Sequence, residues 1–354
     1  MPTVITGSGS YIPEVIKTNV DFSTQVFYDE TGQPIRRSQD EIINRFRQIT
    51  GIEERRYADT SVSTSQMAAI AGKRAIEQAG IDAETIDQVI VAHNFGDLRH
   101  GSAQSELVPS LASRVKHRLG IKNARCVAYD ILFGCPGWLQ GLIQADLFAK
   151  AGAARNCLVI GAETLSRISD QHDRDSMIYS DGAGAVVTQW QEDSHAGIIG
   201  TLSASYALDD LSYITMGKSR CTQKQTDDYY LTMQGRKVYE FALTNVPAAI
   251  QSCLEETGIA ITDVKKIFIH QANQKMNEAI IERLFRLYEM QEVPADIMPM
   301  NIQMHGNSSV ATIPTLFDMV TRGVFPQHSL KPGDVIVMAS VGAGMNINAV
   351  CYRC

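Results

Sequence analysis

The chain has 354 residues, 44% of them hydrophobic and 20% charged, which is typical of a globular protein long enough to bury two cores. A net charge of −7 argues against a general nucleic-acid binder. The seven cysteines are irregularly spaced, with one CxxC at the tail, which argues against a disulfide framework or a zinc site, so we expect no metal. The sequence has no run of about 18 apolar residues and no basic and apolar leader, so we expect no membrane span and a cytoplasmic location.

The first half alternates apolar strand patterns with amphipathic helix patterns. We expect strands at Val4–Ile12, Val89–Ala92, Tyr129–Phe133 and Cys157–Gly161, and helices at Asp40–Gln48, Thr64–Gly80, Leu107–Leu119 and from Pro136 onward. Glycine and polar residues predict loops at Tyr28–Gln39 and Phe95–Ser105, and a tight turn that leads into a strand at Asp181–Val187.

A polar, irregular segment from about Gln191 to Asp227 joins this half to the next. A long helix pattern follows at Val238–Glu256, where Pro247 should kink the helix or move its start. The remaining predicted elements are strands at Lys266–Ile269 and Val335–Ser340, and a helix that opens at Gly306-Asn307 and runs to about Val320.

Two segments resemble each other at a constant offset of 178 residues, from Glu77 to Glu255. In each, a helix ends at Gly-Ile and a buried strand follows, at Val89–Val91 and at Ile267–Ile269. Chance is the alternative, since this connection is common, but the fixed offset of about half the chain favours a duplication. We therefore expect two similar α/β halves with largely parallel sheets covered by helices.

Cys135 lies at the turn between a predicted strand, closed by Gly134, and a predicted helix that Pro136 suits as a first residue. The positive end of that helix should lower the pKa of the thiol and raise its thiolate fraction. A buried core cysteine is the ordinary alternative for a single cysteine.

Polar residues also follow other predicted strands. His270 ends one strand, where ligands of parallel sheets bind, although a single histidine is more often structural. Asn307, taken alone, is an N-cap residue. Gly342 and Gly344 close the last strand and allow backbone N–H groups to approach a ligand.

Together these segments resemble the ketoacyl-ACP synthase III family of the thiolase superfamily over nearly the whole chain. The shared landmarks, in the family's order, are GSGSYIPE, TGIEERR, PSLASRVKHRLGIK, the turn at Cys135, DGAGAVV, HQANQKM, HGNSSVATIP and VGAG. The resemblance implies a five-layered αβαβα sandwich of two duplicated halves, residues 1–190 with the cysteine and residues 191–354 with the histidine and the asparagine.

The resemblance implies that Cys135 is the nucleophile, with His270 and Asn307 as its partners. An acyl thioester would load Cys135, and malonyl-ACP or a ketoacyl thioester would then be decarboxylated and condensed with it. Backbone N–H groups of Cys135 and Ala343 would hold the oxyanion, and a neutral His270, with a pKa below the operating pH, would serve with Asn307 at the enolate. No cofactor is implied. The expected substrates and partners are CoA and ACP thioesters, acyl carrier protein and a second copy in a homodimer.

Binding positions are also implied by the resemblance. Arg174 matches a contact to the CoA nucleotide, Gly235 and Asn273 match the lining of the pantetheine tunnel, and Lys275 matches a contact to phosphate and carrier protein. With other basic residues, Lys275 would form a patch for acidic carrier protein, a solvated helix face being the alternative. These residues are Arg236, Lys237 and Arg286.

Departures from the family pattern leave the substrate open. Ile49 stands where the family usually has a side chain that clamps the adenine. Val108 and Val341 replace phenylalanines that usually narrow the acyl pocket, and the smaller side chains would leave room for a longer or branched acyl chain. A same-fold acyltransferase or hydrolase and an alkylresorcinol- or alkylquinolone-type ketosynthase therefore remain alternatives. A non-catalytic acyl-binding partner subunit is a third, against which the intact Cys135, His270 and Asn307 argue.

Overall fold

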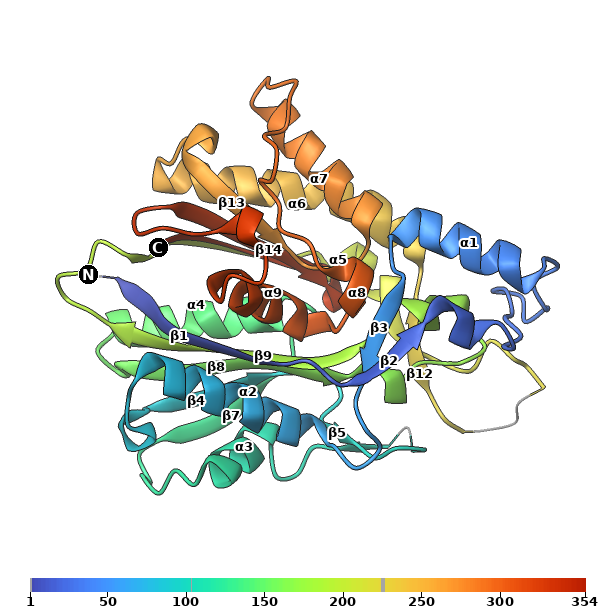
Figure 1. Cartoon of the computed structure of the whole chain (residues 1–354), viewed down its shortest axis with the longest axis horizontal. Helices are drawn as coiled ribbons and strands as arrows, with labels where there is room; N and C mark the ends of the chain where they lie inside the picture. Colours follow the sequence, from blue (N-terminus) through green and yellow to red (C-terminus); the bar gives the residue numbers. More distant parts are fainter. Residues whose placement is uncertain (1, 103, 224–226) are drawn as a thin grey trace.

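Two β-sheets form the centre of the fold (Figure 1). The structure is a computed structural model, and it describes residues 2–102, 104–223 and 227–354. Residue 103, in the loop expected at Phe95–Ser105, and residues 224–226, in the segment expected to join the halves, lie outside the described residues. Among the helices of the described ranges, none is long and apolar enough to cross a membrane.

The first sheet has the strand order β1-β9-β8-β4-β7, and the second has the order β10-β15-β14-β13. The strands are β1 (Thr3–Tyr11), β4 (Gln88–Ala92), β7 (Val127–Ile131), β8 (Asn156–Thr164), β9 (Asp181–Trp190), β10 (Gly197–Ser205), β13 (Val264–Ile269), β14 (Val335–Gly342) and β15 (Asn346–Arg353). β4 is parallel to β7 and β8, and β13 is parallel to β14, but the other pairs are antiparallel. The expectation of largely parallel sheets is therefore wrong. β15, for example, returns from β14 after a three-residue connection that is too short for a crossover.

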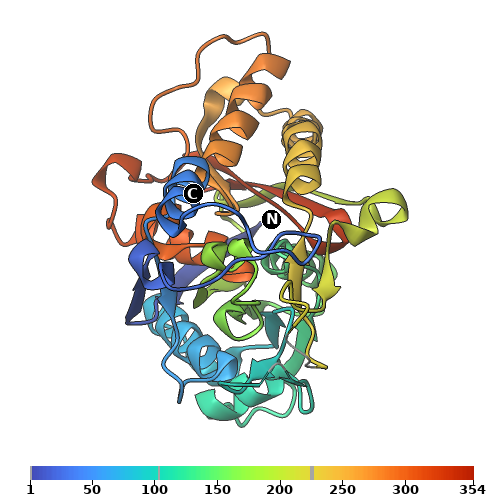
Figure 2. The same cartoon turned by 90° about the vertical axis from the view of Figure 1, so that its right-hand side faces the viewer.

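Helices form three further layers around the two sheets. α2 (Thr64–Ala79) and α3 (Leu111–Leu119) pack on the outer face of the first sheet, and α6 (Gly235–Thr257) and α7 (Gln274–Leu287) pack on the outer face of the second. α4 (Gly137–Lys150) and α9 (Thr312–Thr321) lie between the sheets and share one apolar cluster with strands of both. Figure 2 shows the same order from the side, with α6 and α7 in orange at the top. The predicted five-layered αβαβα sandwich is confirmed.

Shorter elements border these layers. They are α1 (Gln39–Thr50), α5 (Ala207–Asp210), α8 (Ile302–His305), β2 (Val15–Thr18), β3 (Glu54–Tyr57), β5 (Asp97–Leu98), β6 (Ser105–Glu106), β11 (Ile214–Gly217) and β12 (Tyr230–Met233).

The predicted sequence repeat recurs in the backbone. α2 ends at Gly80 (φ 65°) and α6 ends at Gly258 (φ 69°), both in the left-handed conformation that glycine adopts at helix ends. A 3₁₀ turn follows each glycine and leads to β4 and β13, which hold corresponding places in the two strand orders.

α6 continues through Pro247 and begins at Gly235, before the predicted start. A proline removes the N–H that would bond the carbonyl four residues earlier, here that of Leu243. Arg283 of α7 donates to this carbonyl oxygen at 3.2 Å. A side chain of the neighbouring helix thus replaces the missing backbone donor.

Two predicted boundaries differ from the structure. The helix expected from Leu107 begins at Leu111, where the side chain of Ser110 caps it. The segment Gln191–Asp227, expected to be irregular, contains β10, which forms the edge of the second sheet. Edge strands can carry polar residues because only one side is paired, so an apolar pattern does not reveal them.

The glycines of Asp181–Val187 lie inside strand β9, so the predicted glycine turn is wrong. α9 crosses β9 closely at this point, since a Cβ at Gly184 would lie 2.6 Å from the backbone nitrogen of Thr315. Glycine is required there for close packing between layers rather than for a change of chain direction.

Candidate active site

Cys135 lies in a tight turn between β7 and α4. Gly134 has φ 67°, and α4 begins at Gly137, after Pro136 as its cap. A Cβ on Gly134 would lie 2.6 Å from the backbone nitrogen of Ala343, so the turn packs directly against the loop that follows β14. The two segments that carry the expected oxyanion-hole donors are therefore in contact.

Asn307 and Ser309 reach this turn from the loop before α9. The backbone of Asn307 is held by two hydrogen bonds, from its N–H to the Ile178 oxygen at 2.9 Å and from the Ser180 N–H to its oxygen at 2.8 Å. Asn307 Oδ1 accepts from the Ser309 N–H at 2.8 Å, which turns the amide NH₂ away from that bond. Ser309 Oγ in turn donates to Cys135 Sγ at 3.3 Å.

His270 follows β13 and is almost fully buried. Its N–H donates to the oxygen of Ala339 in β14 at 3.0 Å. Its Nδ1 lies 2.7 Å from Thr312 Oγ1, and this hydroxyl also donates to the Ser309 oxygen at 3.0 Å. The predicted Cys135, His270 and Asn307 are thus each one or two hydrogen bonds away from a single residue, Ser309.

Burial controls the protonation of both candidate groups. Loss of solvent raises the pKa of the Cys135 thiol to about 11, although the hydrogen bond from Ser309 acts in the opposite direction. The predicted lowering of this pKa by the helix end is wrong, because α4 begins two residues later and desolvation dominates. Burial lowers the pKa of His270 to about 3, so the predicted neutral histidine is confirmed. Both shifts favour a thiol and a neutral imidazole over an ion pair.

Four residues of this network were not singled out from the sequence: Ser309 and Thr312, described above, and Asn94 and Glu163. Glu163, at the end of β8, is fully buried, and burial raises its pKa to about 7. Its Oε1 accepts from the backbone N–H of Asn94 at 2.8 Å and from Asn94 Nδ2 at 2.6 Å, and Nδ2 lies 3.2 Å from Ser309 Oγ. The sequence signal that could have identified Glu163 is a carboxylate directly after an apolar strand pattern.

The expected binding residues are only partly brought together. Arg174 lies 3.5 Å from Asp175 Oδ1, and a Cβ on Gly235 would lie 3.8 Å from Asp175 Oδ2, so both border the same carboxylate. Asn273 caps α7, its side chain accepting from Met276 N at 3.1 Å. Lys275 is exposed in the first turn of that helix.

The two valines that stand in place of the family's phenylalanines differ in burial. Val341 is buried near the end of β14, one residue before Gly342. Val108 is 90% exposed, so it does not border an enclosed site within a single chain. The other residues of the expected basic patch have local partners: Arg236 pairs with Glu240, Arg286 pairs with Glu282, and Lys237 lies over the ring of Tyr213.

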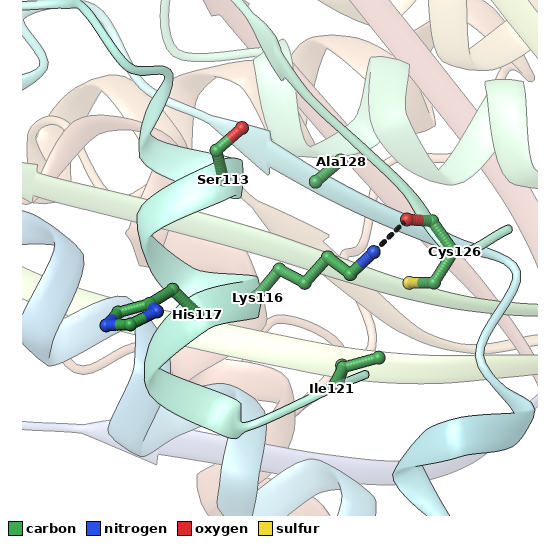
Figure 3. Close-up of a pocket in the computed structure, with 6 residues that line it drawn as sticks. All are labelled: Ser113, Lys116, His117, Ile121, Cys126 and Ala128. Carbon is green, nitrogen blue, oxygen red and sulfur yellow. Dashed lines mark hydrogen bonds between the residues drawn. The ribbon is translucent and has the colours of Figure 1, made fainter. Parts of the chain in front are cut away.

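A pocket of about 370 Å³ lies elsewhere, between α3 and β7 (Figure 3). Lys116 extends into it, and its ammonium donates to the backbone oxygens of Cys126 at 2.7 Å and Asn123 at 2.8 Å. The lysine therefore ties two loop carbonyls together. In the described ranges, no cluster of His, Cys, Asp or Glu side chains could hold a metal ion.

Comparison with known proteins gives a consistent picture. Residues 129–207 match the family described as 3-oxoacyl-[acyl-carrier-protein (ACP)] synthase III, and residues 254–354 match its C-terminal domain. The chain is 35% identical to a β-ketoacyl-[acyl-carrier-protein] synthase III from Ehrlichia canis over 99% of both sequences.

Solved structures with the same fold include two synthases. One is the 3-oxoacyl-[acyl-carrier-protein] synthase III from Aquifex aeolicus, with a TM-score of 0.79 and 30% identity over 99% of this chain and 100% of that one. The other is the priming β-ketosynthase from the R1128 polyketide biosynthetic pathway, with a TM-score of 0.80 and 25% identity over 99% of this chain and 96% of that one.

Proposed function

The chain belongs to the 3-oxoacyl-ACP synthase III family of thiolase-fold condensing enzymes, and from this we propose that it joins an acyl group carried on Cys135 to a malonyl or ketoacyl thioester. The observation that carries the proposal is the hydrogen-bonded convergence of Cys135, His270 and Asn307 on Ser309. These residues come from three distant segments of the chain, and a single hydrogen-bonded network links them.

In the first half-reaction, Cys135 Sγ attacks the acyl thioester and forms a new thioester. The N–H groups of Cys135 and Ala343 stabilise the oxyanion, and the contact between their two loops supports this pairing. The bond to the donor thiol breaks, and the proton of Sγ ends on that departing thiol.

In the second half-reaction, a malonyl thioester loses CO₂ and its electrons form an enolate. The neutral ring of His270 and the NH₂ of Asn307 donate to the enolate oxygen. Neither donor carries a charge, so neither has the large desolvation cost of a buried ion. The carbanion attacks the acyl-Cys135 carbonyl, the carbon–carbon bond forms, and the Cys135 thiolate leaves and takes a proton from water.

Mass spectrometry tests this sequence of steps. Incubation with acyl-CoA, acyl-ACP and malonyl-ACP should give an acyl adduct on Cys135, CO₂ and a longer ketide. Cys135→Ala should give no adduct, whereas His270→Ala and Asn307→Ala should still load but fail to decarboxylate. An adduct without extension would indicate the acyltransferase alternative, and no adduct from any thioester would indicate a non-catalytic subunit.

We propose acyl-ACP, rather than acyl-CoA, as the donor. Ile49 is exposed where an adenine clamp is usual, and Arg174, the expected nucleotide contact, is beside the carboxylate of Asp175. Val341 in place of a larger ring supports a longer or branched acyl chain. The ratio of kcat/KM for matched acyl-ACP and acyl-CoA substrates tests this. Lys275→Glu should raise KM for the ACP substrate more than for the CoA substrate, because carrier proteins are acidic.

We also propose that two copies pair through the free edge of the first sheet. β7 has no neighbour on its outer side in that sheet, and apolar residues at both of its ends are exposed, Val127 by 51% and Leu132 by 67%. Exposed apolar edges favour association, and Val108 is exposed by 90%. Light scattering should report a dimer that Leu132→Lys disrupts. Leu208→Lys, at an exposed position of α5, should not.

A further inference from the structure

Ser309 lies within hydrogen-bond distance of four residues of the site: Asn94, Cys135, Asn307 and Thr312. We propose that it is a fourth catalytic residue, whose hydroxyl donates the hydrogen bond that stabilises the Cys135 thiolate, and that Asn94 and Glu163 hold the hydroxyl in this orientation. The inference rests on the proposed role of Cys135 as the nucleophile.

The backbone of Ser309 is held in an unusual conformation. Its φ is 52°, in the left-handed region that residues with a Cβ seldom occupy. Its N–H donates to Asn307 Oδ1 at 2.8 Å, and its carbonyl oxygen lies 3.0 Å from Thr312 Oγ1, so both sides of the residue contact neighbours. Such backbone strain persists where the surroundings impose it, and it gathers at functional sites. Here it brings Oγ to 3.3 Å from Cys135 Sγ.

The direction of the hydroxyl proton follows from the groups behind it. Asn94 Nδ2 lies 3.2 Å from Ser309 Oγ, and an amide NH₂ can only donate. The orientation of this amide is itself determined, because Nδ2 also donates to Glu163 Oε1 at 2.6 Å, the same oxygen that accepts from the backbone N–H of Asn94. Ser309 Oγ therefore accepts from Asn94, and its own single proton is left for the sulfur.

A donor at the sulfur matters because the rest of the site opposes the thiolate. Burial raises the pKa of the Cys135 thiol, and so does the nearby charge of Glu163, whereas the bond from Ser309 lowers it. A hydrogen bond to a charged group favours that charged form over the neutral one. Its loss should reduce the thiolate fraction, and with it the rate of acyl loading, by about ten- to a hundredfold.

The test follows alkylation of Cys135 by iodoacetamide at pH 8, with the modified residue identified by peptide mass spectrometry. Ser309→Ala should slow alkylation and acyl loading by about ten- to a hundredfold relative to the native enzyme. Ser309→Gly should slow both to the same degree, and because glycine fits a φ of 52° without strain, it separates the missing hydroxyl from a backbone effect. Ser308→Ala, at the neighbouring buried serine, is the matched control and should leave both rates unchanged.

A double-mutant cycle tests the orienting role of Asn94. Asn94→Ala should slow alkylation in the native background and have no further effect when Ser309 is already alanine, since it acts through that hydroxyl. Additive effects overturn the orienting role.

Equal alkylation rates for native enzyme and both Ser309 variants overturn the inference. Alkylation uses no thioester, so its outcome is independent of the condensing activity. If alkylation depends on Ser309 while the native enzyme accepts no acyl group, the proposed function fails and not the hydrogen bond.

Discussion

Glu163 should make the folded protein less stable as the pH rises from about 4.5 to about 7. The side chain is fully buried, and burial raises its pKa from 4.5 to about 7. Between these two values the carboxyl is protonated in the folded chain but ionised in the unfolded chain, so the folded state binds more protons and loses stability with increasing pH. One pKa unit corresponds to about 1.4 kcal/mol, so the loss is about 3 kcal/mol once the pH exceeds 7.

Glu163→Gln removes this dependence because an amide does not titrate. Its oxygen can still accept from Asn94, while its NH₂ takes the place of Oε2, which has no hydrogen-bond partner in the described residues. The unpaired amide lowers stability by a similar amount at every pH, so it cancels when two pH values are compared.

Urea unfolding at pH 5 and pH 8, followed by circular dichroism, measures the effect. The difference in the free energy of unfolding between the two pH values should be smaller in Glu163→Gln than in the native protein by about 2–3 kcal/mol. Glu292→Gln, at an exposed loop position, should leave that difference unchanged. Equal pH differences in the native protein and in Glu163→Gln would refute the reasoning.

Three further perturbations test other parts of the fold and site. Arg283→Ala removes the donor to the Leu243 carbonyl, which lacks its helical partner because of Pro247, and should lower the free energy of unfolding by about 1–2 kcal/mol in chemical denaturation. The control, Arg286→Ala on the exposed face of α7, should change that free energy by less than about 0.5 kcal/mol. Gly161→Ala would drive a Cβ into the carbonyl oxygen of Val310 and should cost about 1–3 kcal/mol and slow acyl loading; Gly72→Ala, where only side-chain ends lie nearby, is the milder control. Burial lowers the pKa of His270 to about 3, so in Glu163→Gln, where the neighbouring carboxyl no longer titrates, the alkylation rate of Cys135 should rise steadily from pH 5 to pH 9. An inflection near pH 6.5 in that variant would contradict a neutral ring.

The sequence predicted the layers of this fold better than it predicted the pairing of strands. Helix ends such as Gly80 and Gly258 are local signals, and the 178-residue offset between them revealed the repeat before any contact was known. Strand direction depends on which strands meet, and that is not local. β10 was missed because an edge strand needs few apolar residues, and the glycines near Gly184 were misread because the crossing of α9 is visible only in three dimensions.

The site divides in the same way. Cys135, His270 and Asn307 could be found because each stands in a distinctive local motif. The pKa of the thiol could not, because the helix end is a local feature whereas desolvation depends on everything packed around the sulfur. Asn94 and Ser309 escaped notice because their relation runs through space, across more than 200 positions of the chain.

The single proton of the Thr312 hydroxyl gives His270 two ways to face a substrate without a change of charge. Oγ1 lies 2.7 Å from Nδ1 and 3.0 Å from the Ser309 oxygen, and it can donate to only one of them. If it donates to Ser309, Nδ1 carries the ring proton and Nε2 is an acceptor; if it donates to Nδ1, Nε2 carries the proton and is a donor. In the proposed reaction the enolate oxygen requires the donor form. An imidazolium would supply the same donor, but only by placing a charge where burial strongly opposes one. A neutral ring whose tautomer is set by a hydroxyl therefore reconciles a dry site with the need for a hydrogen-bond donor at the reacting carbonyl.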